Sequence, residues 1–360
     1  MPLPAPPTPP RSPWQRLYGA AHRARRSYWR SRARHLPRPV VSVGNLHWGG
    51  TGKTPLTAAV AAHLRDSGLS VAILSRGYGR ARRRGGPEVL VVSAGVPGEA
   101  PRLGPEAAGD EPVLLASELP GVAVLVAAER YLAGRHALEH LEPRPDLFLL
   151  DDGFSHVALA RDLDLLTFPA ADPFGGGRLA PEGRLREPLA SVSCADAALL
   201  TGEAAPGDGE ALAAAFAPYG FEGPGFIAPA RFGPPRTPAG KPLAVGTPVL
   251  LVSAVARPEG FARAAAGAPV EVAGELRFPD HHPYPPASLA RIEDAFRKAG
   301  ATAVLTTAKD RVKLAGRLEL PLAELPMEAR PEPRFWAWLE GRLGPLLPRG
   351  GRTAERAETP

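Results

Sequence analysis

The segment Gly49-Gly50-Thr51-Gly52-Lys53-Thr54 combines residue types that can hold a chain of phosphates. Glycine has no Cβ, so the backbone can wrap closely around an anion and point its N–H groups at it. Lys53 can reach the β- and γ-phosphates of a nucleotide, and the Thr54 hydroxyl can ligate Mg²⁺. We therefore predict a phosphate-binding loop with these cofactor-binding residues: Gly49, Gly50, Thr51, Gly52, Lys53 and Thr54.

The residues on either side of this loop are typical of a strand and a helix. Residues 40–43 form a short β-branched run, and an alanine-rich helical pattern continues over residues 56–64. A helix that begins near Lys53 would add the positive end of its dipole to the anion site. The standard loop pattern has glycine where this chain has His47, so a glycine-rich turn with an exposed lysine is the alternative interpretation.

A pair of acidic residues, Asp151 and Asp152, directly follows the apolar run 147–150. An acidic residue at the end of a buried strand can complete a phosphate-loop site by holding Mg²⁺, either directly or through water. On its own, such a pair would more often be a solvated turn. Because the phosphate loop belongs to the same expected sheet, we predict metal ligands at Thr54, Asp151 and Asp152.

Short apolar runs recur along the chain and alternate with helical patterns. They lie at residues 71–74, 88–92, 122–126, 147–150 and 163–168. This alternation predicts an α/β fold with a P-loop NTPase-like parallel sheet flanked by helices, whose ligands bind at the carboxyl ends of the strands. Residues 202–246 are rich in Gly, Pro and Ala with little periodicity, so we expect an irregular connection there.

These patterns divide the chain into successive parts. We predict a disordered lead (1–11), a basic amphipathic helix (12–38), a P-loop nucleotide-binding domain (39–240), a smaller C-terminal α/β domain (241–345) and a disordered tail (346–360). The smaller domain is expected because apolar runs appear again after residue 246 and are separated by amphipathic helical patterns.

The N-terminal helical stretch, residues 12–38, lies in a region whose charge differs from that of the rest of the chain. Residues 1–38 hold nine arginines and no acidic residue, whereas the remainder carries 34 basic and 37 acidic residues. The apolar and aromatic residues of the helix fall close to one face: Trp14, Leu17, Tyr18, Ala21, Tyr28 and Trp29. This helix could lie in an anionic membrane surface, grip nucleic-acid phosphates, or pack its aromatic stripe on the main domain. We favour the membrane surface and expect no nucleic-acid partner, because no recognised nucleic-acid motif accompanies the arginines.

Bulk composition restricts the class of protein. The 360 residues are 44% hydrophobic, which is ample for two packed domains. No apolar run approaches the ~20 residues of a membrane-spanning helix. The single cysteine, Cys194, rules out an internal disulfide framework and fits a reducing compartment. No secretory signal is visible, so we expect the protein in the cytosol.

Taken together, nine segments resemble the tetraacyldisaccharide 4′-kinase family, the lipid A 4′-kinases of Gram-negative bacteria. The matching segments are V-S-V-G-N-L at 41–46, G-G-T-G-K-T-P at 49–55, L-S-R-G-Y-G-R at 74–80, G-D-E-P at 109–112, D-D-G-F at 151–154, R-D-L-D at 161–164, L-R-E-P-L at 185–189, F-P-D-H-H-P-Y at 278–284 and T-T-A-K-D at 306–310. They occur in the order that the family has and span most of the chain.

The resemblance implies a kinase that uses ATP and Mg²⁺ to phosphorylate the 4′-hydroxyl of a tetraacyldisaccharide 1-phosphate. This acceptor is a glycolipid, so the resemblance also implies work at the cytoplasmic face of the bacterial inner membrane, as a peripheral or monotopic protein. It further implies that Asp110 and His281 together accept the hydroxyl proton, with Lys53 and Asp152 completing the catalytic set. A carboxylate that orients an imidazole is a sensible base.

Other charged residues in the family-like segments are candidates for acceptor binding. They are Arg76, Arg80, Glu111, Arg130, His156, Arg186 and Glu187. A guanidinium suits bidentate contact with phosphate, although it also forms structural ion pairs.

Two positions depart from the family pattern. Ser155 stands where glutamine is usual and Ala308 where an acidic residue is common, which puts the roles of His156 and Lys309 in doubt.

Three rival functions can be weighed against the kinase. A GTPase needs an N-K-x-D segment, and residues 307–310 read T-A-K-D in the wrong order. A membrane-tethered P-loop ATPase switch without a sugar acceptor usually has lysine directly before the two glycines, where this chain has Trp48. A pure binding module would tolerate loss of Lys53. The kinase is the favoured prediction and the ATPase switch is the alternative.

Overall fold

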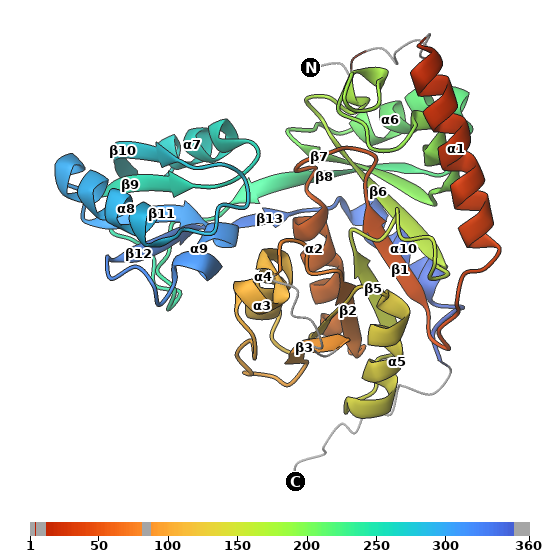
Figure 1. The fold of residues 1–360 in the computed structure, drawn as a ribbon, viewed down its shortest axis with the longest axis horizontal. Coiled ribbons are helices and arrows are strands. Elements are labelled where there is room, and N and C mark those ends of the chain that lie inside the picture. The colour runs from red at the N-terminus through yellow and green to blue at the C-terminus, as the bar shows by residue number, and fades with distance from the viewer. Residues whose placement is uncertain (1–3, 5–11, 81–87, 349–360) are drawn as a thin grey trace.

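The structure, a computed structural model, describes residues 4, 12–80 and 88–348, which form two β-sheets side by side (Figure 1). The order of the large sheet is β13-β8-β7-β6-β1-β5-β2-β4-β3, and that of the small sheet is β10-β9-β11-β12. The predicted lead (1–11) and most of the predicted tail (346–360) lie outside the described residues.

All pairings in both sheets are parallel except those at the two edges of the large sheet, where β3 and β13 run antiparallel to their neighbours. The large sheet comprises β1 (Val40–Gly44), β2 (Val71–Ser75), β3 (Val89–Ala94), β4 (Ala123–Ala127), β5 (Leu147–Asp151), β6 (Leu163–Pro169), β7 (Ala197–Gly202), β8 (Gly225–Phe232) and β13 (Met327–Ala329). The small sheet comprises β9 (Thr247–Ser253), β10 (Val270–Arg277), β11 (Ala303–Thr307) and β12 (Leu322–Leu325). The predicted α/β class with a large parallel sheet is therefore confirmed.

Helices cover both faces of the large sheet, which explains why its central strands are buried along their whole length and mostly apolar. The helices are α1 (Pro13–Arg30), α2 (Lys53–Asp66), α3 (Pro105–Ala108), α4 (Asp110–Glu118), α5 (Arg130–His140), α6 (Asp208–Phe216), α7 (Pro258–Ala266), α8 (Pro286–Ala299), α9 (Ala308–Leu314) and α10 (Pro333–Leu343). Successive side chains of a strand point to opposite faces. Val41 and Val43 thus pack with α2, α4 and α10, whereas Val40 belongs to the core beneath α5.

Two expectations about the later part of the chain are wrong. The stretch 202–246 is not an irregular connection throughout, because it contains α6 and β8. The limits 241–345 of the smaller unit are also too wide. After β12 the chain returns to the large sheet, where β13 pairs with β8 and Phe335 and Leu339 of α10 pack in its core. The large unit is therefore discontinuous in sequence.

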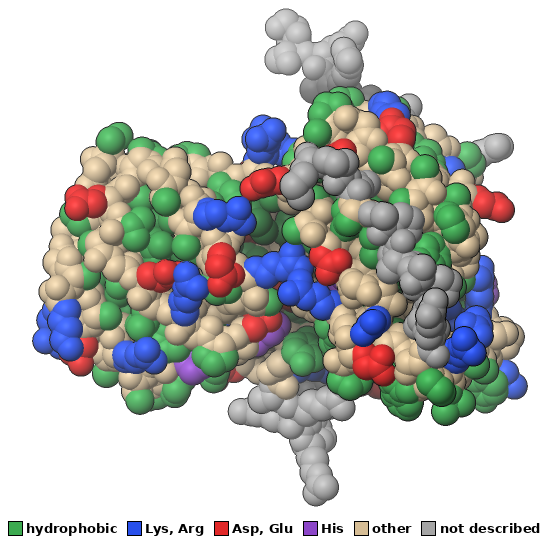
Figure 2. Space-filling view, turned by 90° about the horizontal axis from the view of Figure 1, so that it is seen from above, with side chains coloured by type: hydrophobic (Ala, Val, Ile, Leu, Met, Phe, Trp, Pro, Cys, Tyr) green, Lys and Arg blue, Asp and Glu red, His purple; other side chains and the backbone are tan. Residues whose placement is uncertain are grey.

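The two sheets meet where helix α4 of the large unit packs against helix α9 of the small one. Both helices begin in family-like segments, G-D-E-P and T-T-A-K-D. Figure 2 shows basic and acidic side chains gathered in the region where the two lobes adjoin. The packing of α4 on α9 therefore brings charged residues from distant parts of the chain together.

Helix α1 spans Pro13–Arg30, a shorter range than the predicted 12–38, and lies along the large unit (Figure 1). Its buried residues are Gln15, Gly19 and Arg26, whereas the side chains of Trp14, Leu17, Tyr28 and Trp29 are 43–67% exposed. The alternative in which the aromatic stripe packs on the main domain is therefore wrong for this structure. Among the described residues, no helix has both the length and the apolar character that crossing a membrane requires.

Candidate active site

The predicted phosphate loop connects β1 to α2 and has the backbone that such a loop needs. Gly49 and Gly52 have φ values of +90° and +78°, which favour glycine. A Cβ on Gly49 or Gly50 would meet nothing within 4 Å, so the outer side of the loop is open. Helix α2 begins at Lys53, and its first-turn N–H groups are available to an anion. The loop can therefore cradle phosphate.

Thr51 fixes this loop from the inside. Its hydroxyl accepts a hydrogen bond from Asn45 Nδ2 at 2.7 Å and lies 2.9 Å from the Thr167 hydroxyl. The Thr201 hydroxyl donates to the Thr51 carbonyl at 2.8 Å. The Thr51 side chain is buried. Any contact that Thr51 makes with a phosphate must therefore come from its backbone, because its side chain anchors the loop to Asn45 and β6, and its carbonyl anchors it to β7.

Asp151 ends β5, directly beside β1, and is 2% exposed. It accepts a hydrogen bond from the Thr57 hydroxyl at 3.2 Å. Burial, together with the neighbouring carboxylates of Glu111 and Asp152, raises the pKa of Asp151 to about 7. Carboxylates crowded beside a phosphate loop fit a divalent cation. Within the described residues no three potential ligands form a ready-made cluster. Mg²⁺ usually takes one or two carboxylates together with phosphate oxygens.

Asp152 stands between two cations. Its carboxylate lies 3.8 Å from Lys53 Nζ and takes two hydrogen bonds from Arg186, at 2.9 and 2.5 Å. Burial alone would raise the pKa of Asp152, but Lys53 and Arg186 outweigh it and hold that pKa at about 2. Arg186 also donates to the Asn45 carbonyl at 3.1 Å. Arg186 therefore orients Asp152 next to the phosphate loop instead of pointing toward solvent.

The Asp110–His281 pair is assembled between the two units. Asp110 is the first residue of α4, and its Oδ2 lies 3.3 Å from His281 Nδ1 and 3.3 Å from Lys313 Nζ. Lys309 Nζ lies 3.0 Å from His281 Nε2. Because an ammonium can only donate, Nε2 is the acceptor and Nδ1 carries the proton that faces Asp110. Burial would raise the pKa of Asp110, but the His281 hydrogen bond and the two lysines hold it below its usual range.

Lys313, which the sequence analysis missed, supports this pair from inside the small unit. It is 5% exposed, and its ammonium lies 3.0 Å from Asp310 Oδ1. Asp310 is fully buried and also accepts from the Ala254 N–H and the Thr307 hydroxyl. The available signal was the i, i+3 spacing of Asp310 and Lys313 on one helix, which places the two side chains next to each other. Thr57, one helical turn after Lys53, was missed in the same way.

Arg76 and Arg130 form a second cationic group, and His156 lies against it. Arg130 opens α5, is 4% exposed, and donates to His156 Nδ1 at 3.3 Å. Burial lowers the pKa of Arg130 to about 10, with nearby Arg76 contributing. Burial and the same arginines lower the pKa of His156 to about 3, so its imidazole is neutral. Arg76 itself is exposed. The group can receive an anion.

The remaining predicted residues are placed differently. Glu111 lies 3.9 Å from Lys309 Nζ and close to Asp151, so it belongs with the acidic residues of the site. Arg80 donates its backbone N–H to the Gly77 carbonyl at 3.4 Å, at the end of the range 12–80. Glu187 is buried and accepts a hydrogen bond from Ser155. Its side chain therefore faces the protein interior and is not placed to contact the glycolipid substrate.

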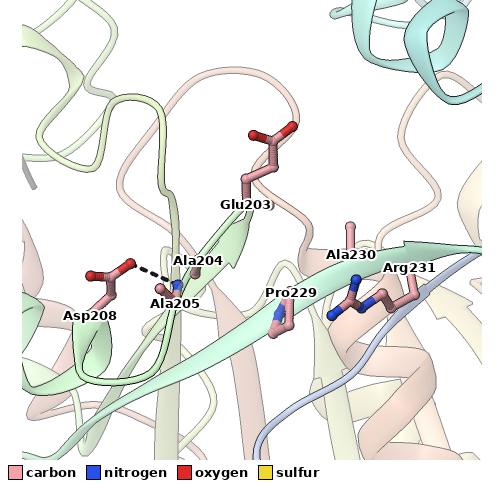
Figure 3. A pocket seen from close by; sticks show the side chains of 8 residues that line it. Glu203, Ala204, Ala205, Asp208, Pro229, Ala230 and Arg231 are labelled. Atoms are coloured by element: carbon pink, nitrogen blue, oxygen red, sulfur yellow. Dashed lines mark hydrogen bonds between the residues drawn. The ribbon is translucent and has the colours of Figure 1, made fainter. Parts of the chain in front are cut away.

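A cavity of about 350 Å³ opens at the carboxyl ends of β7 and β8. Its lining includes Glu203, Asp208 and Arg231, and the Ala205 N–H donates to Asp208 at 2.8 Å (Figure 3). The cavity adjoins the phosphate loop, because Thr201 at the end of β7 is the residue that a Cβ on Gly52 would touch. Its place in the sheet suits the base and ribose of a nucleotide.

A phosphate loop after a central parallel strand, with an acidic pair at the end of the neighbouring strand β5, defines a P-loop nucleotide-binding protein. The sequence model of the family described as tetraacyldisaccharide-1-P 4′-kinase matches residues 11–344. The chain belongs to this family. The predicted resemblance is therefore confirmed, and it favours the kinase over the ATPase switch.

Individual relatives agree. The chain is 38% identical over 325 residues to a tetraacyldisaccharide 4′-kinase of Geobacter sulfurreducens, covering 88% of this chain and 87% of that protein. It is 43% identical over 285 residues to one of Anaeromyxobacter sp. strain Fw109-5, covering 77% and 74%. A crystal structure of LpxK from Aquifex aeolicus in complex with ATP is similar, with a TM-score of 0.71 and 29% identity over 93% of this chain and 98% of that one.

Proposed function

We propose that this protein transfers the γ-phosphate of ATP to the 4′-hydroxyl of a tetraacyldisaccharide 1-phosphate in lipid A biosynthesis. The observation that carries the proposal is the Asp110–His281 pair, which projects from α4 and the small unit beside the acidic residues of the phosphate-loop site. Family membership supplies the acceptor class, and the open loop and the adjoining cavity suit ATP.

The phosphate loop and the acidic residues would handle the nucleotide. Backbone N–H groups from Gly49 to Thr54 and the Lys53 ammonium bind the phosphates. Thr54, Asp151 and Asp152 would hold Mg²⁺, which when bound neutralises charge on the transferring phosphoryl group. Glu111 adds negative charge at the same place, and Arg186 keeps the Asp152 carboxylate in one orientation.

His281 would accept the proton of the acceptor hydroxyl. Its Nε2 is the ring nitrogen that carries a lone pair, and in this structure that lone pair accepts a hydrogen bond from Lys309. The hydroxyl would take the place of the Lys309 ammonium at Nε2, while Asp110 holds the proton on Nδ1 and stabilises the imidazolium that forms. Lys309, once displaced, stays close enough to bind the transferring group. The basic group around Arg76 and Arg130 would bind a phosphate of the acceptor.

A transfer assay tests the reaction. γ-labelled ATP and Mg²⁺ are mixed with detergent-dispersed tetraacyldisaccharide 1-phosphate and either the unaltered protein or Lys53→Ala. We expect label in the glycolipid, at the 4′ position by product analysis, and a loss of roughly 10²–10³-fold in Lys53→Ala because an electrostatic contact to the transferring group is removed. Label that appears only as free phosphate, with or without glycolipid, would contradict the kinase and favour the ATPase switch.

We further propose that α1 docks on the cytoplasmic face of the bacterial inner membrane. Exposed aromatic side chains on a helix that also exposes Arg16, Arg23, Arg25 and Arg30 are typical of an interfacial helix on anionic lipid. This arrangement would deliver the protein to an acceptor that carries acyl chains.

The vesicle prediction uses a variant that keeps every charge. We expect Trp14→Ala, Leu17→Ala and Trp29→Ala together to lower the fraction of protein that sediments with anionic vesicles, most clearly at high salt, where the arginines are screened. Val245→Ala is the matched control, because Val245 is 85% exposed in the linker between the sheets. Unchanged sedimentation of the triple variant would place the anchor elsewhere.

A further inference from the structure

The inner face of α1 is polar, in contrast to its exposed aromatic residues. Gln15 donates to Glu182 at 2.9 Å and accepts from the Leu179 N–H at 3.1 Å. Tyr18 donates its hydroxyl to the Arg186 carbonyl at 3.4 Å. A helix that served only as a membrane anchor would need no such contacts. The inner face of α1 is therefore built to bind particular backbone and side-chain groups of the large unit.

Arg26 adds a buried charged contact on the same inner face. It is 8% exposed, and its Nη1 donates both to the Phe154 carbonyl, at 3.2 Å, and to Glu187, at 3.3 Å. Its guanidinium also lies over the Phe154 ring, 4.1 Å from the centroid. Glu187 is 2% exposed and takes a further hydrogen bond from Ser155. One arginine of α1 thus binds two separate segments of the large unit.

Both segments are connected to Asp152, one through the chain and the other through hydrogen bonds. Phe154 and Ser155 follow it within three residues, in the loop after β5. Glu187 follows Arg186, whose guanidinium takes the Asp152 carboxylate by two hydrogen bonds. Asp152 itself has φ of +52°, in the left-handed region that non-glycine residues seldom adopt. Arg26 thus cross-links the loop that follows Asp152 to the segment that carries its partner Arg186.

We propose that Arg26 is a positioning residue for phosphoryl transfer, acting through Glu187 and Phe154 on the Arg186–Asp152 contact. Helix α1 is then part of the catalytic unit as well as a membrane-docking element, and a displacement of the helix is transmitted to Asp152. When Arg26 is lost, Glu187 keeps the Ser155 hydroxyl and His22, whose Nε2 lies 3.5 Å from it, but not its buried guanidinium, so its carboxylate is expected to shift toward these groups or toward water. The inference rests on the proposed role of Asp152.

The test compares two neighbouring arginines in the full-length protein, assayed in detergent with dispersed tetraacyldisaccharide 1-phosphate. Arg26→Gln removes the buried contact. Arg25→Gln removes the same charge from an exposed residue of the same helix. We expect Arg26→Gln to lower kcat by roughly 10- to 100-fold, the effect of a misplaced catalytic group. Its KM for the glycolipid should stay within about twofold, as expected when only transition-state contacts are lost. Arg25→Gln should keep the unaltered kcat, and Arg26→Lys should recover part of the loss.

Equal kcat in Arg26→Gln and Arg25→Gln would overturn the proposal. A raised KM for the glycolipid with kcat retained would also overturn it, because Arg26 and Glu187 would then serve acceptor binding.

If Arg26→Gln does not fold, the variant Ser155→Ala tests the proposal in its place. It removes one hydrogen bond to Glu187 and should lower kcat with KM unchanged, and an unchanged kcat counts against the proposal. Asp152→Asn is the reference: if it keeps full turnover, the proposed metal and phosphate site fails as well.

Discussion

Asp110→Asn is expected to lower kcat by roughly 10²–10⁴-fold, the usual contribution of a general base, while the affinity for ATP stays nearly unchanged. The carboxylate holds the proton of His281 on Nδ1 and so keeps Nε2 available to the acceptor hydroxyl. An amide lacks the charge that stabilises the imidazolium formed when His281 takes the proton. ATP affinity is spared because the phosphate loop and Lys53 do not contact Asp110 through any hydrogen bond or ion pair among the described residues.

The measurement is steady-state kinetics together with nucleotide binding by calorimetry. Glu106→Gln is the matched control, since Glu106 is an exposed acid of the neighbouring helix α3 and its loss changes the net charge equally. It should keep the unaltered kcat. An Asp110→Asn protein that loses ATP binding but retains turnover would refute the role of Asp110 in the base.

Lys313→Met is expected to destabilise the protein by about 3–5 kcal/mol, the usual cost of breaking a buried ion pair. The ammonium lies within 3.0–3.3 Å of two carboxylates, those of Asp310 and Asp110. Lys313 and Asp310 are buried, and Asp110 is half-buried. Methionine matches the length of the lysine stem but leaves both carboxylates without their shared cation. Turnover should fall too, because the pKa of Asp110 is held down partly by Lys313.

Urea unfolding compares this variant with Lys298→Met, which removes an exposed lysine from the last turn of α8. The control should stay within about 0.5 kcal/mol of the unaltered protein. If the two variants were equally stable, Lys313 would not compensate the buried carboxylates in the way that its contacts indicate.

The parts of the site that lie within one strand–loop–helix segment could be predicted from the sequence. The glycines, Lys53 and Thr54 follow one strand, and the Asp151–Asp152 pair follows another. Because parallel strands bring their carboxyl ends to one edge, their proximity could be inferred. The strands β8 and β13 were not predicted. β8 lies in a Gly- and Pro-rich stretch. β13 is only three residues long, and it belongs to the large sheet although it follows the strands of the small sheet in sequence.

Contacts between the two units could not be predicted from spacing. Asp110 and His281 are far apart in the chain and meet only because α4 packs on α9, so the pair was suggested by family resemblance alone. Arg26 was hidden for a different reason. It is one of nine arginines in residues 1–38, and no pattern in the sequence distinguishes Arg26, which is buried, from the exposed arginines of α1. Glu187 was assigned to the acceptor because its partner on α1 could not be foreseen.

The most direct test of this account is a double-mutant cycle on the two members of the base. kcat for lipid phosphorylation is measured for the unaltered protein, Asp110→Asn, His281→Ala and the double variant. If the two residues act as one unit, the double variant should be no more than about threefold slower than the slower single variant, because groups that act together are not additive. Losses that multiply in the double variant would show that Asp110 and His281 act independently and would contradict the mechanism.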